Sequence, residues 1–266
     1  MIYCNLKGGL GNMFFQIAAA KAIAIDCNTD CSFPNLDSHL HCLNSDKTYN
    51  PSLKHSNEYK YFLGHLNTSP HASTKTAVFP FEYTQSPLFK EDIIIDGFFQ
   101  SEKYFVTHRE EILDFLTPSL ETLHTIIIGK YKSIVKGKTT SIHVRRGDYL
   151  KYPNHHPVQS VEYYNEAIEL VKDKTEQFII FSDDIQWCKD NLKVDNSIYI
   201  QNEKDYVELY LMSFCNNNII ANSSFSWWGA WLNRNENKIV IGPSKWFGPS
   251  INHDTSDILP ESWIKI

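Results

Sequence analysis

The chain has 266 residues, of which 42% are hydrophobic, 14% aromatic and 21% charged. This composition is typical of a folded protein and excludes a mainly disordered one. The formal net charge of -6 excludes a broad basic surface of the kind that binds nucleic acid or anionic lipid. A bound anion therefore has to be held by a local group of residues.

The sequence contains no apolar run of the roughly 18 residues that a membrane-spanning helix needs, and its first residues lack the pattern of a signal peptide. The six cysteines do not form the framework of a small disulfide-rich protein. We therefore expect a cytoplasmic protein with reduced cysteines.

The first half begins with a predicted strand, Ile2–Leu6, a glycine turn and a predicted helix, Asn12–Ile25. Residues 26–90 are rich in Asn, Ser, His, Pro and Thr and show no clear periodicity. A buried strand over Asp92–Phe99 and a helix over Glu102–Leu116 are predicted next.

The second half alternates short β-branched runs with helix-like segments. The predicted strands are Thr140–Arg146, Phe178–Ser182, Ser197–Gln201, Asn218–Asn222 and Lys238–Gly242, and the predicted helices are Ser160–Lys172, Ile185–Leu192, Asp205–Cys215 and Ser224–Asn233. This alternation predicts an α/β fold with a parallel, doubly wound sheet, which binds ligands beyond the carboxyl ends of its strands. We place a soft boundary near residue 130, which gives lobes of residues 1–130 and 131–266.

A glycine-rich turn, Gly8-Gly9-Leu10-Gly11-Asn12, joins the first predicted strand to the first helix. Such a turn lets the backbone approach a ligand, and the following helix offers free amides to an anion. The sequence is neither a phosphate-binding loop of the Walker type nor a dinucleotide fingerprint. An ordinary tight turn explains it equally well.

Two adjacent arginines, Arg145 and Arg146, end the predicted strand that contains His143, in a chain with only four arginines among its 25 basic residues. A guanidinium grips phosphate oxygens in a bidentate manner, so a pair at this edge suits a diphosphate whose charge has to be stabilised. The alternative is a surface ion pair with Asp148.

Two further motifs follow predicted strands. In Asn222-Ser223-Ser224-Phe225-Ser226, the hydroxyls and the free amides of the helix start can bind a pyrophosphate. Ordinary N-capping is the alternative, but it explains only one of the serines. Three tryptophans follow, and we expect them in the core. The carboxylates of Asp183 and Asp184 can accept hydrogen bonds from the nucleobase or ribose of a nucleotide, and helix N-capping is the alternative. The set Cys27, Cys31, His39, His41 and Cys42 matches no standard zinc site, and no Asp-x-Asp triplet occurs.

The ordered motifs GGLGNMFFQ, GFFQSEKYF, HVRRGDY, FSDD and IIANSSFSWWGAWLN together resemble those of the α-1,2-fucosyltransferases of glycosyltransferase family 11. The resemblance runs from residue 2 to about residue 247 and is weak over residues 26–90. It implies a GT-B-like α/β fold with two Rossmann-like lobes and the donor site in the cleft between them. The first lobe would then lie on the acceptor side, and the second would bind GDP-fucose.

The resemblance also implies metal-independent, inverting transfer of L-fucose from GDP-β-L-fucose to the 2-hydroxyl of a terminal β-galactose, with no cofactor. By the same resemblance, Arg145 holds the β-phosphate with Arg146 in support, and His143 and Asp183 address the guanosine. It also implies that Ser223, Ser224 and Phe225 contact the pyrophosphate or the nucleotide, and that Asn12 contacts the donor from the facing lobe.

The general base is left open between Asp148 and His156, and a route in which the departing phosphate takes the proton is a third option. The expected partners are GDP-fucose and a galactose-terminated glycan of surface polysaccharide, such as O-antigen, and no nucleic acid. Peripheral contact with the inner face of a membrane that carries lipid-linked glycan stays open, as does the oligomeric state. The rival functions are fucosyl transfer with another linkage, such as α-1,6, protein O-fucosylation, and a non-catalytic nucleotide-sugar or glycan-binding module.

Overall fold

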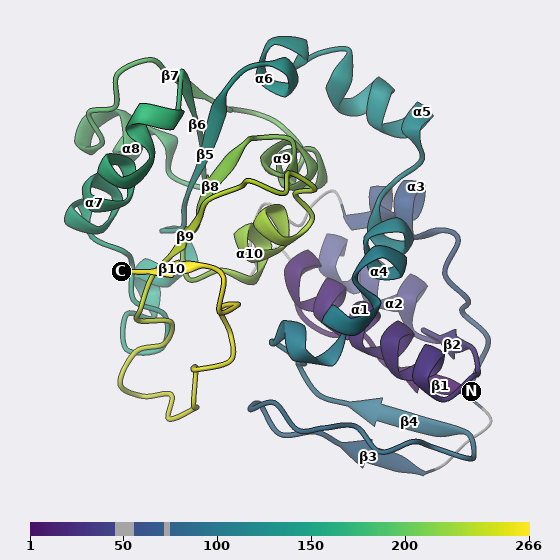
Figure 1. Ribbon diagram of the computed structural model, residues 1–266. Helices are drawn as coiled ribbons and strands as arrows, with labels where there is room; N and C mark the ends of the chain where they lie inside the picture. The colour runs from purple at the N-terminus through teal and green to yellow at the C-terminus, as the bar shows by residue number, and fades with distance from the viewer. Residues whose placement is uncertain (46–55, 72–74) are drawn as a thin grey trace. The chain divides into compact units, whose positions relative to one another are not determined.

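The computed structural model describes residues 1–45, 56–71 and 75–266 (Figure 1). The chain divides into two compact units, Met1–Ser119 with His253–Pro260 and Leu120–Asn252 with Glu261–Ile266. The sequence placed the boundary near residue 130, whereas residues 120–130 belong to the second unit, where the π-helical turn η4 (His124–Ile128) packs on α9 (Asp205–Ser213). Residues 253–260 belong to the first unit.

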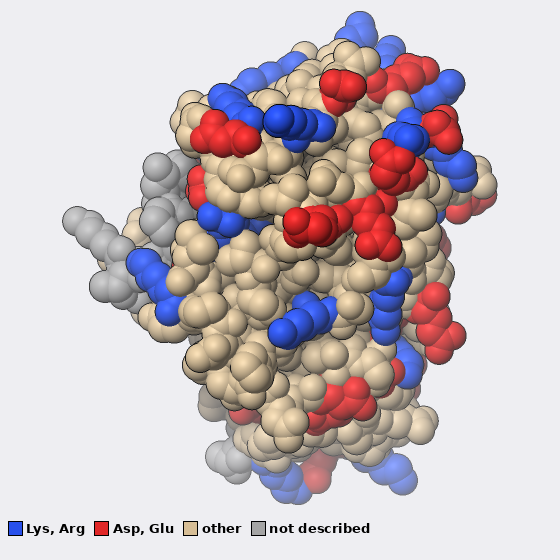
Figure 2. All heavy atoms as spheres, turned by 90° about the vertical axis from the view of Figure 1, so that its left-hand side faces the viewer, with Lys and Arg blue, Asp and Glu red and all other residues tan. Residues whose placement is uncertain are grey.

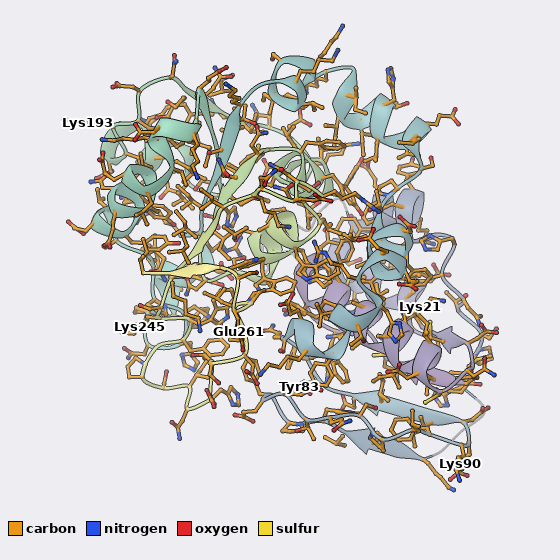
Figure 3. All side chains as sticks on the ribbon, viewed as in Figure 1. Lys21, Tyr83, Lys90, Lys193, Lys245 and Glu261 are labelled. Carbon is orange, nitrogen blue, oxygen red and sulfur yellow. The ribbon has the colours of Figure 1, made fainter. Side chains whose placement is uncertain are left out.

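The first unit is built on a parallel sheet with the strand order β2-β1-β4-β3. Its strands are β1 (Ile2–Cys4), β2 (Cys31–Ser32), β3 (Thr76–Val78) and β4 (Ile93–Asp96), and its helices are α1 (Leu10–Asp26), α2 (Leu36–Ser45), α3 (Lys60–Leu63) and α4 (Arg109–Leu116). The predicted strand and helix at the N-terminus are confirmed. Helix α1 is buried along most of its length and packs on β1 and α4. Its Lys21, labelled in Figure 3, lies with the ammonium over the ring of Phe115.

The predicted helix Glu102–Leu116 is broken near its start. Two 3-10 turns, η2 (Glu102–Tyr104) and η3 (Val106–His108), precede α4. Phe105 lies between them with an extended φ of -145°, and its fully buried ring packs on Phe15 with a centroid distance of 6.2 Å. Core packing of one aromatic ring thus overrides helix continuity. Within residues 26–90, the sequence missed β2, α2, α3 and β3, and residues 46–55 and 72–74 of that stretch lie outside the described residues.

The second unit is built on a parallel sheet with the strand order β10-β9-β8-β5-β6-β7. Its strands are β5 (Thr139–Val144), β6 (Gln177–Ser182), β7 (Ser197–Tyr199), β8 (Asn217–Ile219), β9 (Val240–Gly242) and β10 (Ile264–Lys265). The main helices are α7 (Val161–Val171), α8 (Ile185–Asn191), α9 and α10 (Ser224–Trp231), with α5 (Leu120–Leu123), η4 and α6 (Lys132–Lys136) before β5 and the 3-10 turns η5 (Asp148–Lys151) and η6 (Lys172–Lys174) between elements.

The predicted parallel, doubly wound α/β fold of this unit is confirmed. Figure 1 shows α7 and α8 on one face of the sheet and α9 and α10 on the other. The chain leaves β5 toward α7 and leaves β8 toward α10, and these two strands are neighbours in the sheet. The carboxyl ends of β5 and β8 therefore form a topological switch point, where doubly wound sheets bind their ligands.

The core of the second unit confirms the predicted roles of several residues. Ile142 and Val144 are fully buried in the cluster under α7, and the three tryptophans of α10 are buried and contact one another. Ser160 caps α7 by accepting a hydrogen bond from the amide of Tyr163. All six cysteines are free thiols. Among the described residues, no helix has both the length and the apolar character needed to cross a membrane.

Candidate active site at the carboxyl ends of β5, β6 and β8

Arg145 follows β5 directly and is held by two carboxylates. Its guanidinium lies 2.6 Å from Oδ1 of Asp148 and 3.0 Å from Oδ2 of Asp183, and its side chain is only 16% exposed. The anticipated ion pair with Asp148 is therefore present, but a second acid, from the end of β6, shares it. A guanidinium held in this way is fixed in direction and keeps part of its fork for a phosphate oxygen.

Arg146 contacts a different set of residues. Its Nε donates to Oδ2 of Asp184 at 3.0 Å, and its guanidinium lies 4.1 Å from the centre of the Trp187 ring. The two guanidiniums therefore contact different side chains. Arg146 fastens the end of β5 to the start of α8.

The sequence left open whether Asp183 and Asp184, after β6, cap a helix or face a ligand, and in the structure the two aspartates have different roles. Asp184 caps α8 by accepting a hydrogen bond from the Trp187 amide at 3.1 Å, as expected of an N-cap residue. Asp183 accepts from the Arg146 amide at 2.9 Å in addition to its ion pair with Arg145. A Cβ at Gly147 would lie 2.7 Å from the Asp183 carboxylate, so this turn needs a glycine.

His143 lies on β5 at the base of the site and is 5% exposed. Burial, with a smaller effect from Arg145, lowers the pKa of its imidazole to about 3, so the ring is neutral at physiological pH. Nδ1 has no hydrogen-bond partner, and the ring of Phe225 lies 5.6 Å away. A buried polar atom that lacks a partner in the protein is well suited to receive one from a ligand.

Tyr149 connects the predicted residues of three segments. Its ring stacks on that of His156 at 4.8 Å, and the Arg145 guanidinium lies 5.5 Å from its centre. Its hydroxyl donates to the carbonyl of Asn222 at 2.9 Å and is hydrogen-bonded to the Ser223 side chain. Burial raises the pKa of this hydroxyl to about 12, so it stays a donor.

His156 is half-buried, with Nδ1 shielded from solvent and without a hydrogen-bond partner. Burial lowers the pKa of its imidazole, and this effect exceeds the opposite effect of the Asp148 carboxylate. A neutral imidazole can accept a proton at physiological pH. Asp148, the other candidate base, is 44% exposed and already paired with Arg145.

The turn from β8 into α10 is ordered by side-chain amides. Asn222 donates to the carbonyls of Pro157 and Trp246 at 3.0 and 2.9 Å, and it accepts from Gln159 at 3.0 Å. Gln159 also donates to the carbonyl of Lys245, which lies in the segment after β9 (Figure 3). This network fixes the segment that carries His156 against the start of α10.

Helix α10 begins after Ser223, whose side chain makes no capping hydrogen bond. N-capping therefore does not explain this serine, and the amides of Ser224 and Phe225 at the helix start have no capping side chain. The first turn of such a helix attracts an anion. The structure thus places Ser223, Ser224 and Phe225 at the same sheet edge as Arg145 and His143.

The sequence missed one acidic residue near this edge. Glu208 is half-buried in α9, between the buried Val207 and Leu209. Burial, with smaller effects from the carboxylates of Asp205, Glu203 and Asp183, raises the pKa of its carboxyl to about 8. A glutamate inside a run of buried apolar residues was the signal that could have revealed it.

Asn12 belongs to the first unit, in the first turn of α1. Its Oδ1 accepts a hydrogen bond from Gln100 at 2.8 Å. Gly8 adopts a φ of 78°, and a Cβ there would meet the Asn12 amide at 2.6 Å. The glycine turn therefore needs Gly8 for its conformation, as well as for close approach of the backbone.

The described residues contain no group of three or more His, Cys, Asp or Glu side chains that could hold a metal ion. On the face drawn in Figure 2, positive and negative side chains are interspersed.

The sequence profile of Glycosyl transferase family 11 matches residues 81–266, more than half of the chain. The chain belongs to glycosyltransferase family 11. Its similarity to two relatives spans the whole sequence. It is 32% identical to an O-antigen biosynthesis glycosyltransferase of Escherichia coli, WbnK, with all of both chains covered. It is 31% identical to an α-1,2-colitosyltransferase of Escherichia coli, with 100% of this chain and 99% of that protein covered.

More distant relatives match a shorter stretch of this family 11 chain. A galactoside α-(1,2)-fucosyltransferase 1 of Saimiri sciureus is 27% identical over 34% of this chain and 28% of its own length. Two solved structures share the fold. The NodZ α-1,6-fucosyltransferase soaked with GDP-fucose has a TM-score of 0.51 at 11% identity, covering 87% of this chain and 92% of that one. POFUT1 in complex with GDP-fucose has a TM-score of 0.51 at 12% identity, covering 89% and 94%. The predicted GT-B-like α/β fold class is confirmed.

Proposed function

We propose that this family 11 glycosyltransferase transfers L-fucose, with inversion, from GDP-β-L-fucose to the 2-hydroxyl of a terminal β-galactose, in the synthesis of a surface polysaccharide such as O-antigen. Family membership and the names of the two full-length relatives support the reaction class. The observation that carries the proposal is the fixed guanidinium of Arg145 at the switch point of the second sheet, beside the uncapped start of α10.

The donor would occupy the carboxyl edge of β5, β6 and β8. In this proposal Arg145 binds the β-phosphate, and the first turn of α10, from Ser223 to Phe225, binds the pyrophosphate. The neutral His143 offers its unpartnered Nδ1 to the guanosine, with Asp183 nearby. Arg146 supports the site indirectly, because it fixes the turn that carries Asp183. A donor contact by Asn12 stays a prediction.

The reaction needs one bond to form and one to break. The acceptor oxygen attacks the anomeric carbon of fucose, the bond from that carbon to the β-phosphate oxygen breaks, and the electron pair leaves with GDP. Arg145 stabilises the charge that grows on this phosphate. The acceptor proton goes to His156, whose lowered pKa keeps it neutral, or to Asp148; transfer to the departing phosphate is the remaining route.

A colitosyl donor is the second candidate, because a relative that covers the whole chain is named an α-1,2-colitosyltransferase. Colitose lacks one hydroxyl of fucose, so the phosphate and base contacts would be the same for both donors. Discrimination would rest on one polar contact to the sugar.

The test is transfer and GDP release with GDP-fucose and GDP-colitose in parallel, on a panel of β-galactosides and without added metal. We expect product from GDP-fucose with an α-1,2 linkage, identified by NMR. Product from GDP-colitose alone would show that the donor is GDP-colitose and not GDP-fucose. GDP binding without turnover of either donor on any acceptor would refute the proposal and indicate a binding module.

A further inference from the structure

In the first unit, the chain leaves β4 with two consecutive phenylalanines in opposite environments. Phe99 is fully buried, whereas Phe98 is 39% exposed at the carboxyl edge of the sheet. Burial of both rings would be the favourable default for apolar side chains. The structure therefore keeps one aromatic ring at the surface beside the glycine turn.

The backbone holds this arrangement by an unusual conformation. Phe99 has a φ of 53°, in the left-handed region that bulky residues rarely adopt. Its ring is fixed in the core by Phe79 and Tyr104, each with a centroid distance of 5.1 Å. Before it, a Cβ at Gly97 would lie 3.0 Å from the Phe79 side chain. The position of Phe98 is therefore determined by packing beneath it.

Polar groups surround the exposed ring. Lys7, just after β1, places its ammonium 5.2 Å from the centre of the Phe98 ring and pairs with Asp96, the last residue of β4. The side chains of Lys7 and Asp96 are 42% and 46% exposed, so both keep hydrogen-bonding capacity toward solvent. The half-buried Gln100 amide bonds to Asn12 at 2.8 Å at the same sheet edge.

We propose that Phe98, with Lys7 and Asp96, binds the terminal sugar ring of the acceptor, and this inference rests on the function proposed above. One face of a β-galactoside consists of C–H groups that pack on an aromatic ring, and its hydroxyls need both donors and acceptors. Lys7 supplies donors and Asp96 supplies acceptors, within reach of one ring.

The charges favour a neutral ligand over an anion. Lys7 is already neutralised by Asp96, and an exposed carboxylate beside the ring repels phosphate. A single ring flanked by an ion pair is also a poor surface for an apolar protein partner. An uncharged polyol with one apolar face fits these groups best.

The test compares Phe98→Ala with Phe98→Tyr, which keeps the ring, and with Tyr61→Ala as a control. Tyr61 belongs to the same unit, on α3, and is 73% exposed. KM is measured separately for lactose and for GDP-fucose. We expect Phe98→Ala to raise the KM for lactose about tenfold, equivalent to ~1.4 kcal/mol, with less than a twofold change in the KM for GDP-fucose. Phe98→Tyr should restore most of the affinity, and the control should keep both constants.

Saturation-transfer NMR with methyl β-galactoside on the protein alone separates this inference from the proposed function. A signal in the wild type that is lost in Phe98→Ala supports the subsite even if GDP-fucose proves to be the wrong donor. Normal fucosyl transfer with an unchanged lactose KM in Phe98→Ala would overturn the inference and leave the proposed function standing. An equal rise of both KM values would overturn it too, because the ring would then not act on the acceptor alone.

Discussion

The ring of Tyr149 lies parallel to the imidazole of His156, with 4.8 Å between their centres and 20° between their planes. The Tyr149 hydroxyl reaches the β8–α10 turn, and Arg145 lies against the same ring. One side chain therefore sets the positions of the proposed base, the proposed phosphate ligand and the proposed pyrophosphate site.

Replacement of Tyr149 should separate its ring from its hydroxyl. Tyr149→Phe loses the bonds of the hydroxyl to the Asn222 carbonyl and to the Ser223 side chain, about 1–2 kcal/mol of stability, and keeps the stack. Tyr149→Leu opens the stack and exposes His156, whose pKa should rise toward the ordinary value of a histidine because burial is what lowers it. The readouts are the His156 titration by NMR and the acidic limb of the kcat/KM profile, and both should move upward only in Tyr149→Leu.

Tyr163→Phe is the matched control for this pair. Its hydroxyl donates to the Ile220 carbonyl at 2.6 Å, near the same turn but away from His156. Loss of that bond should lower the free energy of unfolding by a similar amount and leave the His156 titration in place. If Tyr163→Phe moved the pH profile as much as Tyr149→Leu, the effect would be general destabilisation and not the stack.

Arg145 and Arg146 should differ in what they contribute, although they are neighbours in sequence. Arg145→Lys keeps a charge but loses the fork held by Asp148 and Asp183, and we expect kcat to fall by about 10²-fold or more because the phosphate loses its planar ligand. Arg146→Lys loses its contacts to Asp184 and Trp187, so we expect about 1–2 kcal/mol of lost stability and a smaller effect on kcat. Urea unfolding and initial rates, measured on both variants, distinguish the catalytic role of Arg145 from the structural role of Arg146. Equal losses of kcat would show that the two arginines act together.

Much of the second unit could be predicted from the sequence, because its strands are β-branched runs separated by helix-like segments, two of which, α7 and α8, begin at a capping side chain. The same alternation predicted which residues emerge at the carboxyl edge of the sheet, including His143 and Arg145. In the first unit, α3 and the two-residue strand β2 are too short to produce a periodic pattern. Both residues of β2 are buried, and α3 buries Phe62 and Leu63. Helix α2 carries buried leucines at 36, 40 and 43, but histidines and polar residues obscure that spacing.

The contacts within the site could not be predicted from the motifs. Arg145 and Arg146 pair with different aspartates because Asp183 and Asp184 follow β6, and the parallel pairing of β5 with β6 ends with Val144 opposite Ser182. Only that register decides which acid faces which arginine. Likewise, the partners of Tyr149 come from a segment seven residues later and from a turn more than 70 residues later. The sequence indicated the chemistry of the edge, whereas the sheet order decided the pairings.

His143 should make the protein sensitive to acid. Its folded-state pKa of about 3 lies below the ordinary value of 6.5, so the unfolded chain binds a proton that the folded state refuses. The cost is absent above pH 6.5 and grows as the pH falls from there toward 3, to on the order of 2–4 kcal/mol. His143→Gln removes this cost, so its stability relative to the wild type should improve between pH 7 and pH 4.5 in urea unfolding. A constant difference over that range would contradict the neutral, buried state of His143.

Glu208 should show the opposite pH trend. Its folded-state pKa of about 8 lies above the ordinary value of 4.5, because burial and the nearby carboxylates disfavour the charged form. Between pH 4.5 and 8 the unfolded chain releases a proton that the folded state keeps, so the wild type loses stability as the pH rises through this window, by on the order of 2–4 kcal/mol. Glu208→Gln removes the titration, and its advantage over the wild type should grow from pH 5 to pH 8 and then level off. When both variants are measured side by side, the stability advantage of His143→Gln should grow toward acidic pH and that of Glu208→Gln toward basic pH. A change in the same direction for both variants would indicate an effect on the unfolded chain instead of the titration of His143 and Glu208.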